Sequence, residues 1–112
     1  MKADLHNHSY YSDGVLSPKE LVIIANDVGC DLFSLTDHDT TLGLSEAQLE
    51  SDKLGLRLVN GVEISAFWKN RAIHIIGLGI DINSDILQNG LSFNQELRKV
   101  RAKKIALDLW RS

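Results

Sequence analysis

The most constraining feature of this 112-residue sequence is a regular alternation of short apolar segments with segments of helical periodicity. We expect strands at residues 2–6, 31–36, 56–65 and 72–80, and helices at about 18–28, 43–53 and 92–112. This β-α-β-α-β-β-α order is typical of an α/β layer structure built on a mainly parallel sheet.

Local capping signals support the first helix. Ser17 suits the N-cap, Pro18 suits the first helical position, and Glu20 lies three residues after the cap, where it completes a capping box. Gly29 is expected to end the helix. The apolar face of this helix is expected to consist of Leu21, Ile24, Ala25 and Val28.

The remaining elements carry weaker signals. Thr41 is the candidate cap of the second helix, and Gly61 is a candidate bend within the third strand. The segment 72–80 is apolar at nearly every position, which indicates a strand covered on both faces. Residues 84–89 are expected to form a separate helical turn before the last helix.

The composition is that of one small globular domain and excludes several classes of protein. The chain is 44% hydrophobic and 24% charged. No apolar run approaches the roughly 18 residues that a membrane span needs, and no signal peptide is visible after Met1. The single cysteine, Cys30, excludes an intrachain disulfide, fits a cytoplasmic location and is expected to be a buried apolar residue.

The net charge of −3 is distributed unevenly. Residues 1–95 carry a net charge of −7 and residues 96–112 a net charge of +4. An acidic body suits cation binding, and the basic segment has two interpretations: a contact for RNA or phosphate, or a solvated helix face. The solvated face is the favoured interpretation.

Side chains that carry chemistry follow the predicted strands. His6 and His8 are two residues apart, so on a strand both imidazoles point to the same face. The first cluster is His6, His8 and Asp13, and the later ones lie around His38, Glu63 and His74. Because the carboxyl ends of parallel strands meet at one rim, these clusters are expected to converge there. All four histidines of the chain belong to these clusters. The candidate ligands are His6, His8, Asp13, His38, Glu63 and His74.

Each candidate has an ordinary alternative. His6 and His8 form a chance pair in the first alternative, and His38 is a plain loop residue in the second. Glu63 has Arg57 and Arg71 as possible ion-pair partners, and His74 has the role of a hydrogen-bonded core histidine as its alternative. Asp37 and Asp39 flank His38 and are expected to orient that side chain rather than to bind a metal themselves.

Imidazole and carboxylate ligands without thiolates suit Zn²⁺, Mn²⁺ or Fe²⁺. Six candidates exceed the three or four protein ligands of one catalytic zinc, so two or more ions sharing a bridging Glu63 are expected. Metal ions roughly 4 Å apart activate a water and stabilise both the attacking and leaving oxygens of a phosphoryl displacement. Asp13, His38 and Glu63 are the candidate catalytic residues.

The stretches DLHNHSYYSDG, LTDHDT, GVEIS and IHIIGLGID resemble the successive opening motifs of the PHP family, named for polymerase and histidinol phosphatase. The resemblance implies a distorted seven-stranded β/α barrel with a trinuclear manganese, iron or zinc site. By position, His6 and His8 match the opening pair of ligands, and Asp13 and His38 match ligands of a second metal. Glu63 then matches the bridging carboxylate and His74 a further ligand.

The family also draws ligands from later strands, and these have no counterpart in this chain. Residues 1–112 are therefore expected to be the N-terminal part of a single PHP domain, roughly half of the barrel. Exposed strand edges of such a half barrel favour self-association. The phosphate-binding residues are not assigned; Lys69 and Arg71 are weak local substitutes for the arginines of the family.

The resemblance implies a metal-dependent phosphoesterase acting on small phosphorylated metabolites, nucleotide bisphosphates or short oligonucleotides. It is closest to the branch of nucleoside 3′,5′-bisphosphate phosphatases and 5′-to-3′ exoribonucleases. Two alternatives stay open: a non-catalytic, metal-stabilised PHP domain, and an amidohydrolase-type metallohydrolase. Asp13 so close to the histidine pair, and Glu63 in place of a carbamylated lysine, argue against the amidohydrolase.

Overall fold

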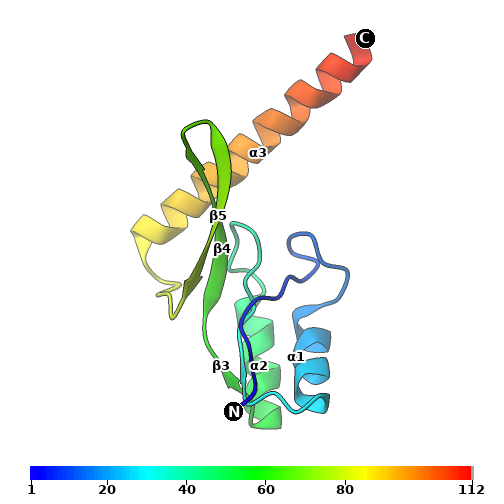
Figure 1. Cartoon of the computed structure of the whole chain (residues 1–112), viewed down its shortest axis with the longest axis vertical. Coiled ribbons are helices and arrows are strands. Elements are labelled where there is room, and N and C mark those ends of the chain that lie inside the picture. The colour runs from blue at the N-terminus through cyan, green and yellow to red at the C-terminus, as the bar shows by residue number, and fades with distance from the viewer. Residues whose placement is uncertain (112) are drawn as a thin grey trace.

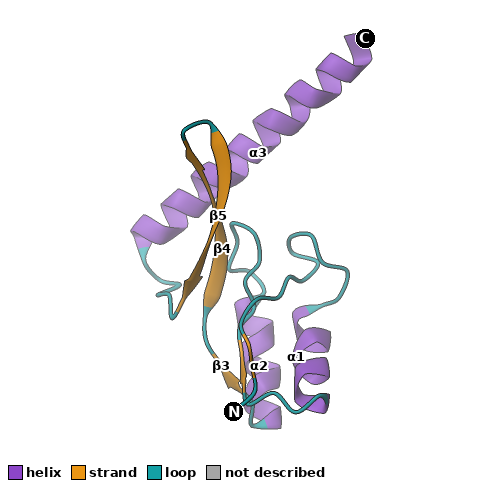
Figure 2. Ribbon diagram, in the orientation of Figure 1, coloured by secondary structure: helices purple, strands orange, loops and turns teal. Residues whose placement is uncertain are grey.

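A computed structural model describes residues 1–111, without the side chains of residues 67 and 111, and has two layers of structure stacked along its 52 Å length (Figure 1). The lower part holds three short parallel strands and two helices that lie side by side. The upper part holds a long antiparallel hairpin crossed by a long helix (Figure 2). The α/β class and the parallel sheet are confirmed.

The parallel sheet has the strand order β1-β2-β3, with β1 at Ala3–Asp4, β2 at Leu32–Phe33 and β3 at Arg57–Leu58. The intervening helices are α1 (Pro18–Asp27) and α2 (Leu44–Leu54). Buried apolar side chains of β2 and the two helices form the core between them, and Cys30 lies among these side chains as a free, buried thiol, as expected. The core residues are Val22, Ala25, Cys30, Phe33, Leu35, Leu44, Ala47 and Leu56.

The start of α1 confirms the capping prediction, whereas its buried face differs from the expected one. The Glu20 N–H donates to the Ser17 hydroxyl at 3.1 Å, and the Ser17 N–H donates to the Glu20 carboxylate at 3.4 Å. The buried residues are Pro18, Val22 and Ala25, whereas Ile24 and Val28 are exposed. The helix packs on one side only, so the narrower stripe at i, i+4 and i+7 is the one that is covered.

The predicted strand 56–65 is wrong, because it is two strands in different sheets. β3 ends at Leu58 in the parallel sheet, and β4 (Gly61–Trp68) pairs antiparallel with β5 (Arg71–Leu78). A Cβ at Gly61 would collide with the Ser34 hydroxyl and lie 2.8 Å from Thr36 Cγ2. The absence of a side chain at Gly61 therefore lets the chain pass close to β2 as it changes sheets.

The parallel arrangement holds for β1, β2 and β3, whereas the two longest strands, β4 and β5, form an antiparallel hairpin that was not expected. Lys69 and Asn70 join them with φ values of +50° and +63°, the left-handed conformation of tight two-residue hairpin turns. β5 was expected to be covered on both faces, but Ile75 and Leu78 are exposed in this structure.

The last helix is longer than expected. Residues 85–111 form one continuous helix, α3 (Asp85–Arg111), in place of a separate turn followed by a helix. Gly90 lies inside it, at a modest cost in helix propensity. Its second half extends away from the body (Figure 1). Within residues 1–111, no helix is both long and apolar enough to cross a membrane.

The cap of α2 also differs from the prediction. Gly43 occupies the N-cap position and makes no side-chain capping bond. The Thr41 hydroxyl instead accepts a hydrogen bond from the Gln88 side chain at 3.1 Å, which ties the start of α3 to this loop.

Candidate metal centre

The candidate ligands meet at the upper edge of the parallel sheet, where the hairpin joins it. His6 and His8 follow β1, and His38 follows β2. His38 pairs with Glu63 in a parallel bridge: the Glu63 N–H donates to the Asp37 carbonyl at 3.0 Å, and the Asp39 N–H donates to the Glu63 carbonyl at 2.9 Å. The first residues of β4 thus lie beside the segment that follows β2, and this pairing brings Glu63 to the rim of the parallel sheet.

Glu63 lies at the centre of the cluster. Its side chain is 6% exposed and faces all four histidines of the chain. Oε1 lies 2.6 Å from His6 Nε2 and 3.4 Å from His8 Nε2. Oε2 lies 2.8 Å from His38 Nδ1 and 3.3 Å from His74 Nδ1. Neither Arg57 nor Arg71 is its partner, so the structure gives no support to that alternative for Glu63.

Asp13 approaches the same cluster from the loop after β1. Its Oδ1 lies 2.6 Å from His8 Nδ1, and its Oδ2 lies 3.1 Å from His38 Nε2. His8 and His38 are therefore each placed between two carboxylates. The Asp13 side chain is 63% exposed, so this part of the cluster opens to solvent.

The six side chains form three groups of three whose ligand atoms lie within 4.8 Å of one another. Any two of the groups share one residue, and Glu63 belongs to two of them. The groups are His6–His8–Glu63, His8–Asp13–His38 and His38–Glu63–His74. All six sequence-predicted ligands are thus brought together.

Two buried nitrogens fit a bound cation. His8 Nε2 and His38 Nδ1 are buried without a hydrogen-bond partner, although both lie close to the Glu63 carboxylate. Buried polar atoms are normally paired, because an unpaired one loses its hydration without compensation. A divalent metal ion shared by these nitrogens and Glu63 would satisfy them, and this nitrogen and oxygen donor set suits zinc, manganese or iron.

The electrostatics of the cluster favour ionised carboxylates. Burial raises the pKa of Glu63, but the contact with His6 and the charges of His38 and His8 outweigh it and hold the pKa below its ordinary value. The same balance holds for Asp13: desolvation raises its pKa, but the contacts with His8 and His38 outweigh this and hold the pKa below its ordinary value. Both groups are therefore anionic at neutral pH, as metal ligands must be.

Asp37 and Asp39 were expected to orient His38, but their hydrogen bonds go elsewhere. Asp37 accepts from the Ser9 N–H at 2.6 Å, the Ser9 hydroxyl at 2.7 Å and the Ser12 hydroxyl at 2.8 Å. It therefore fixes the loop that carries Asp13. The sequence offered no signal for this role, because both serines lie at least 25 residues away along the chain.

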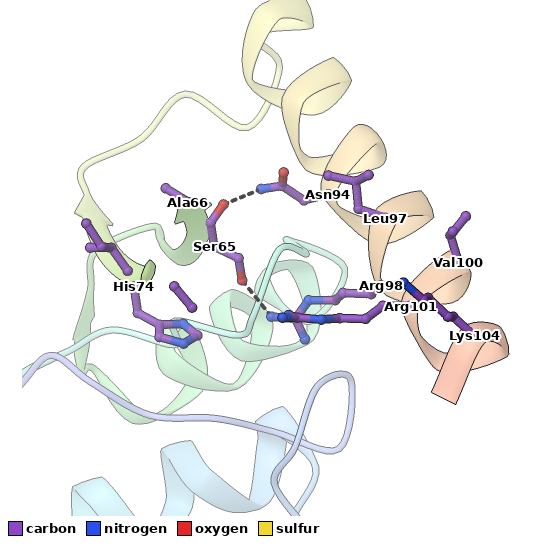
Figure 3. Close-up of a pocket in the computed structure, with 11 residues that line it drawn as sticks. Ser65, Ala66, His74, Asn94, Leu97, Arg98, Val100, Arg101 and Lys104 are labelled. Carbon is purple, nitrogen blue, oxygen red and sulfur yellow. Dashed lines mark hydrogen bonds between the residues drawn. The ribbon is translucent and has the colours of Figure 1, made fainter. Parts of the chain in front are cut away.

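Asp39 anchors α3 beside the site. It accepts from the Ser65 N–H and the Asn94 amide, each at 2.9 Å, and its Oδ2 lies 2.9 Å from Arg98 Nε. Arg98 donates to the Ser65 hydroxyl at 2.7 Å, and the Asn94 amide donates to the Ser65 carbonyl at 2.9 Å; Figure 3 shows both hydrogen bonds. The sequence placed Arg98 only within the basic segment, which is therefore not a wholly solvated face.

Two cavities adjoin the cluster and share His74 and Arg98. The hairpin cavity, about 460 Å³, lies between the hairpin and α3 (Figure 3). The second, about 620 Å³ and called the rim cavity below, has Asp13 and His38 among its lining residues, together with Tyr11, Leu42, Gln95 and Lys99. Lys69 and Arg71, at the hairpin turn, line neither of these two cavities.

An α/β domain with a histidine and carboxylate cluster at its strand ends defines a metal-binding class of proteins. The family model of the PHP domain matches residues 4–105. The chain belongs to the PHP domain family.

Curated relatives extend this result. The chain is 45% identical over 104 residues to a 5′-3′ exoribonuclease of Haemophilus influenzae, covering 93% of this chain and 38% of the relative. It is 42% identical over 106 residues to a 3′,5′-nucleoside bisphosphate phosphatase of Chromobacterium violaceum, covering 95% of this chain and 37% of the relative. The chain thus spans less than two fifths of the length of these relatives.

Solved structures agree on the fold. A Chromobacterium violaceum protein named an amidohydrolase superposes with a TM-score of 0.91 at 41% identity, over 97% of this chain and 38% of that one. A Bifidobacterium adolescentis protein, provisionally described as a metal-dependent phosphoesterase, gives a TM-score of 0.92 at 29% identity, over 100% of this chain and 39% of that one.

Proposed function

We propose that the intact protein is a metal-dependent phosphoesterase. The observation that carries the proposal is the buried Glu63 carboxylate facing four imidazoles, two of which keep a buried nitrogen without a hydrogen bond. The names of the curated relatives, an exoribonuclease and a bisphosphate phosphatase, support the same reaction class.

The site is proposed to hold two to three divalent ions of manganese, iron or zinc. The three overlapping groups of ligands support this number, with Glu63 as the bridge. Bound ions would supply an activated water and positive charge against the phosphate oxygens. Asp13, His38 and Glu63 are proposed to be the residues nearest the reaction: His38 and Glu63 each belong to two of the groups, and Asp13 is the carboxylate of the group that opens to solvent.

The protein's own cations would orient the substrate. Arg98 and Lys99 line the rim cavity on the side of α3, opposite no acidic group other than Asp13 among its lining residues. A phosphate ester entering this cavity would meet these cations as well as the metal ligands. The proposed substrates are small phosphorylated metabolites, nucleotide bisphosphates or short oligonucleotides, in agreement with the names of the relatives.

The size of the chain relative to its relatives supports one further part of the proposal. Residues 1–112 would be the N-terminal part of a single PHP domain and about half of a distorted (β/α)7 barrel. The exposed outer strand of the hairpin and the uncovered part of α3 would favour self-association of this chain. The cytoplasm is the proposed location, in keeping with the unpaired Cys30.

The amidohydrolase alternative has one observation in its favour, the name of a structural neighbour. Glu63 argues against it, because the position between the histidines is taken by a carboxylate rather than by a lysine. A nucleotide bisphosphate and an amide substrate, offered to the same metal-loaded protein, would separate the two reactions.

The first experiment is to measure bound metal per chain by plasma mass spectrometry after loading with Mn²⁺ or Zn²⁺. Glu63→Gln and His8→Ala should each lose most of the bound metal, and the hydrolysis of a nucleotide bisphosphate by the full-length protein should be lost with it. Asp27→Asn, which changes an exposed carboxylate at the end of α1 that belongs to none of the three ligand groups, is the matched control. Retention of metal and activity by Glu63→Gln would overturn the proposal.

A further inference from the structure

One side of the rim cavity is formed by an aromatic and an apolar side chain that the candidate metal site does not need. Asp13, His38 and His74 line its metal end. Tyr11 and Leu42 also line it, with 42% and 72% of their surface exposed. Apolar and aromatic walls with a few convergent polar groups are typical of pockets that bind small molecules.

The ring of Tyr11 is held in place by its own loop. The Tyr11 N–H donates to the Ser9 hydroxyl at 3.2 Å, and that hydroxyl donates to the buried Asp37 at 2.7 Å. A Cβ on Gly43 would lie 3.2 Å from Tyr11 Cδ2, so the edge of the ring packs over bare backbone. The ring of Tyr10 supports it from another side, with centroids 5.0 Å apart. A ring fixed in this way loses little freedom when a ligand packs on it.

The same loop fixes Asp13. Asp37 also accepts from the Ser12 hydroxyl at 2.8 Å, so the residue between Tyr11 and Asp13 is anchored to the same carboxylate. The aromatic ring and the metal ligand therefore keep a constant separation. A ligand that reaches both groups must have a size that matches this separation.

Two cationic side chains of α3, Arg98 and Lys99, also line the rim cavity. Lys99 is exposed and lies 3.3 Å from Glu96, a surface pair that contributes little. Arg98 is fixed by Asp39 and lines both cavities. The rim cavity thus combines an anion-binding side with an apolar, aromatic side. A phosphate ester whose organic part is a flat aromatic ring uses both sides, whereas a simple sugar phosphate uses only one.

We propose that Tyr11, with Leu42 beside it, is a specificity-determining residue that stacks on the nucleobase of a nucleotide whose phosphate lies at the metal end of the rim cavity. The proposal rests on the proposed function and adds a residue that selects nucleotides over other phosphate esters. Stacking on an aromatic side chain tolerates any base, because every base has a flat π face.

The test compares two ligands that differ only in the base, adenosine 5′-monophosphate and ribose 5-phosphate. Their binding to the zinc-loaded full chain is measured by titration calorimetry, with hydrolysis followed in parallel. One stacked base contributes a preference of about 5- to 150-fold, so the wild-type protein should favour the nucleotide by a ratio in this range. Tyr11→Phe should keep this ratio, and Tyr11→Leu should bring it close to one.

Phe93→Leu is the control, because Phe93 is an exposed aromatic residue of α3 that does not line the rim cavity. It should leave the ratio unchanged. A ratio that is unchanged in Tyr11→Leu, a ratio that falls equally in Phe93→Leu, or no nucleotide preference in the wild-type protein would each overturn the proposal. Nuclear Overhauser effects between Tyr11 ring protons and base protons give the same answer without a variant.

The two levels of the proposal fail differently. Ribose 5-phosphate binding that is the same with and without zinc contradicts the phosphoesterase site but leaves the dependence of the nucleotide ratio on Tyr11 measurable. Zinc-dependent binding of both ligands with no dependence on Tyr11 contradicts the stacking alone.

Discussion

Replacing Asp37 tests how the metal cluster is held together. Its carboxylate is 2% exposed and accepts three short hydrogen bonds, all from the loop between β1 and α1. Hydrogen bonds to a charged group contribute about 1.5–3 kcal/mol each, but bonds that share one acceptor group are not additive. We therefore expect Asp37→Ala to lower the free energy of unfolding by about 3–5 kcal/mol, and Asp37→Asn by roughly half as much.

The more specific consequence concerns metal binding. A freed loop no longer holds Asp13 against His8 and His38, so the ion of that group should bind about 10- to 100-fold more weakly. Urea denaturation measures the stability, and competition with a chromogenic chelator measures the metal affinity. Asp52→Asn, an exposed carboxylate that accepts one hydrogen bond from Gln48, is the control and should change the stability by about 0.5 kcal/mol or less.

The outcomes separate a positioning role from a purely structural one. A loss of stability with unchanged metal affinity in Asp37→Asn would refute the argument that this carboxylate acts through Asp13. Unchanged stability and unchanged affinity would mean that the three hydrogen bonds contribute nothing in solution.

Three other predictions follow from the fold and the site. Gly61→Ala should lower the free energy of unfolding by about 1–3 kcal/mol in urea denaturation, because the added methyl group collides with Ser34. Gly90→Ala, in open space within α3, should raise it by about 0.5–1 kcal/mol. Equal effects of the two substitutions would contradict the close approach of Gly61 to Ser34 where the chain changes sheets. Metal affinity, measured by chelator competition between pH 5.5 and 8, should fall steadily as the pH is lowered, because imidazole ligands must lose a proton to bind; a flat profile would argue against histidine ligation. Sedimentation velocity should detect concentration-dependent self-association that Ile75→Lys reduces, and a monomer at all concentrations would show that the uncovered hairpin is not an association surface.

The ligand cluster could be predicted from the sequence because its residues gather near strand ends, although β1 ends at Asp4 and leaves the histidine pair in the following loop rather than on the strand. His38 follows β2 and Glu63 lies near the start of β4, whereas His74 lies in the middle of β5. The strand and helix order could be predicted for a similar reason, since capping residues and apolar periodicity are local signals. Ser17 and Glu20 form the capping box that their spacing indicated.

The features that could not be predicted depend on contacts between distant parts of the chain. The change of sheets after β3 is set by how closely Gly61 passes Ser34 and Thr36, and no local pattern records that contact. Residues 84–89 and 92–112 were expected to be separate elements, but the single glycine between them costs only about 1 kcal/mol in a long helix. The side-chain partners of Asp37 and Asp39 lie 25 to 59 residues away along the chain.

The attachment of α3 couples this helix mechanically to the candidate metal ligands. Asn94, Gln95 and Arg98 hold the helix to Asp39 and Ser65, which are one and two residues beyond the candidate ligands His38 and Glu63. At 1.5 Å per residue, its 27 residues make a rod of about 40 Å. Since Asn94, Gln95 and Arg98 lie in or near the first half of the rod, a load applied at its far end would act with leverage on the backbone that carries two of the six candidate ligands. Movement of the far end of α3 would therefore be transmitted to the backbone beside His38 and Glu63.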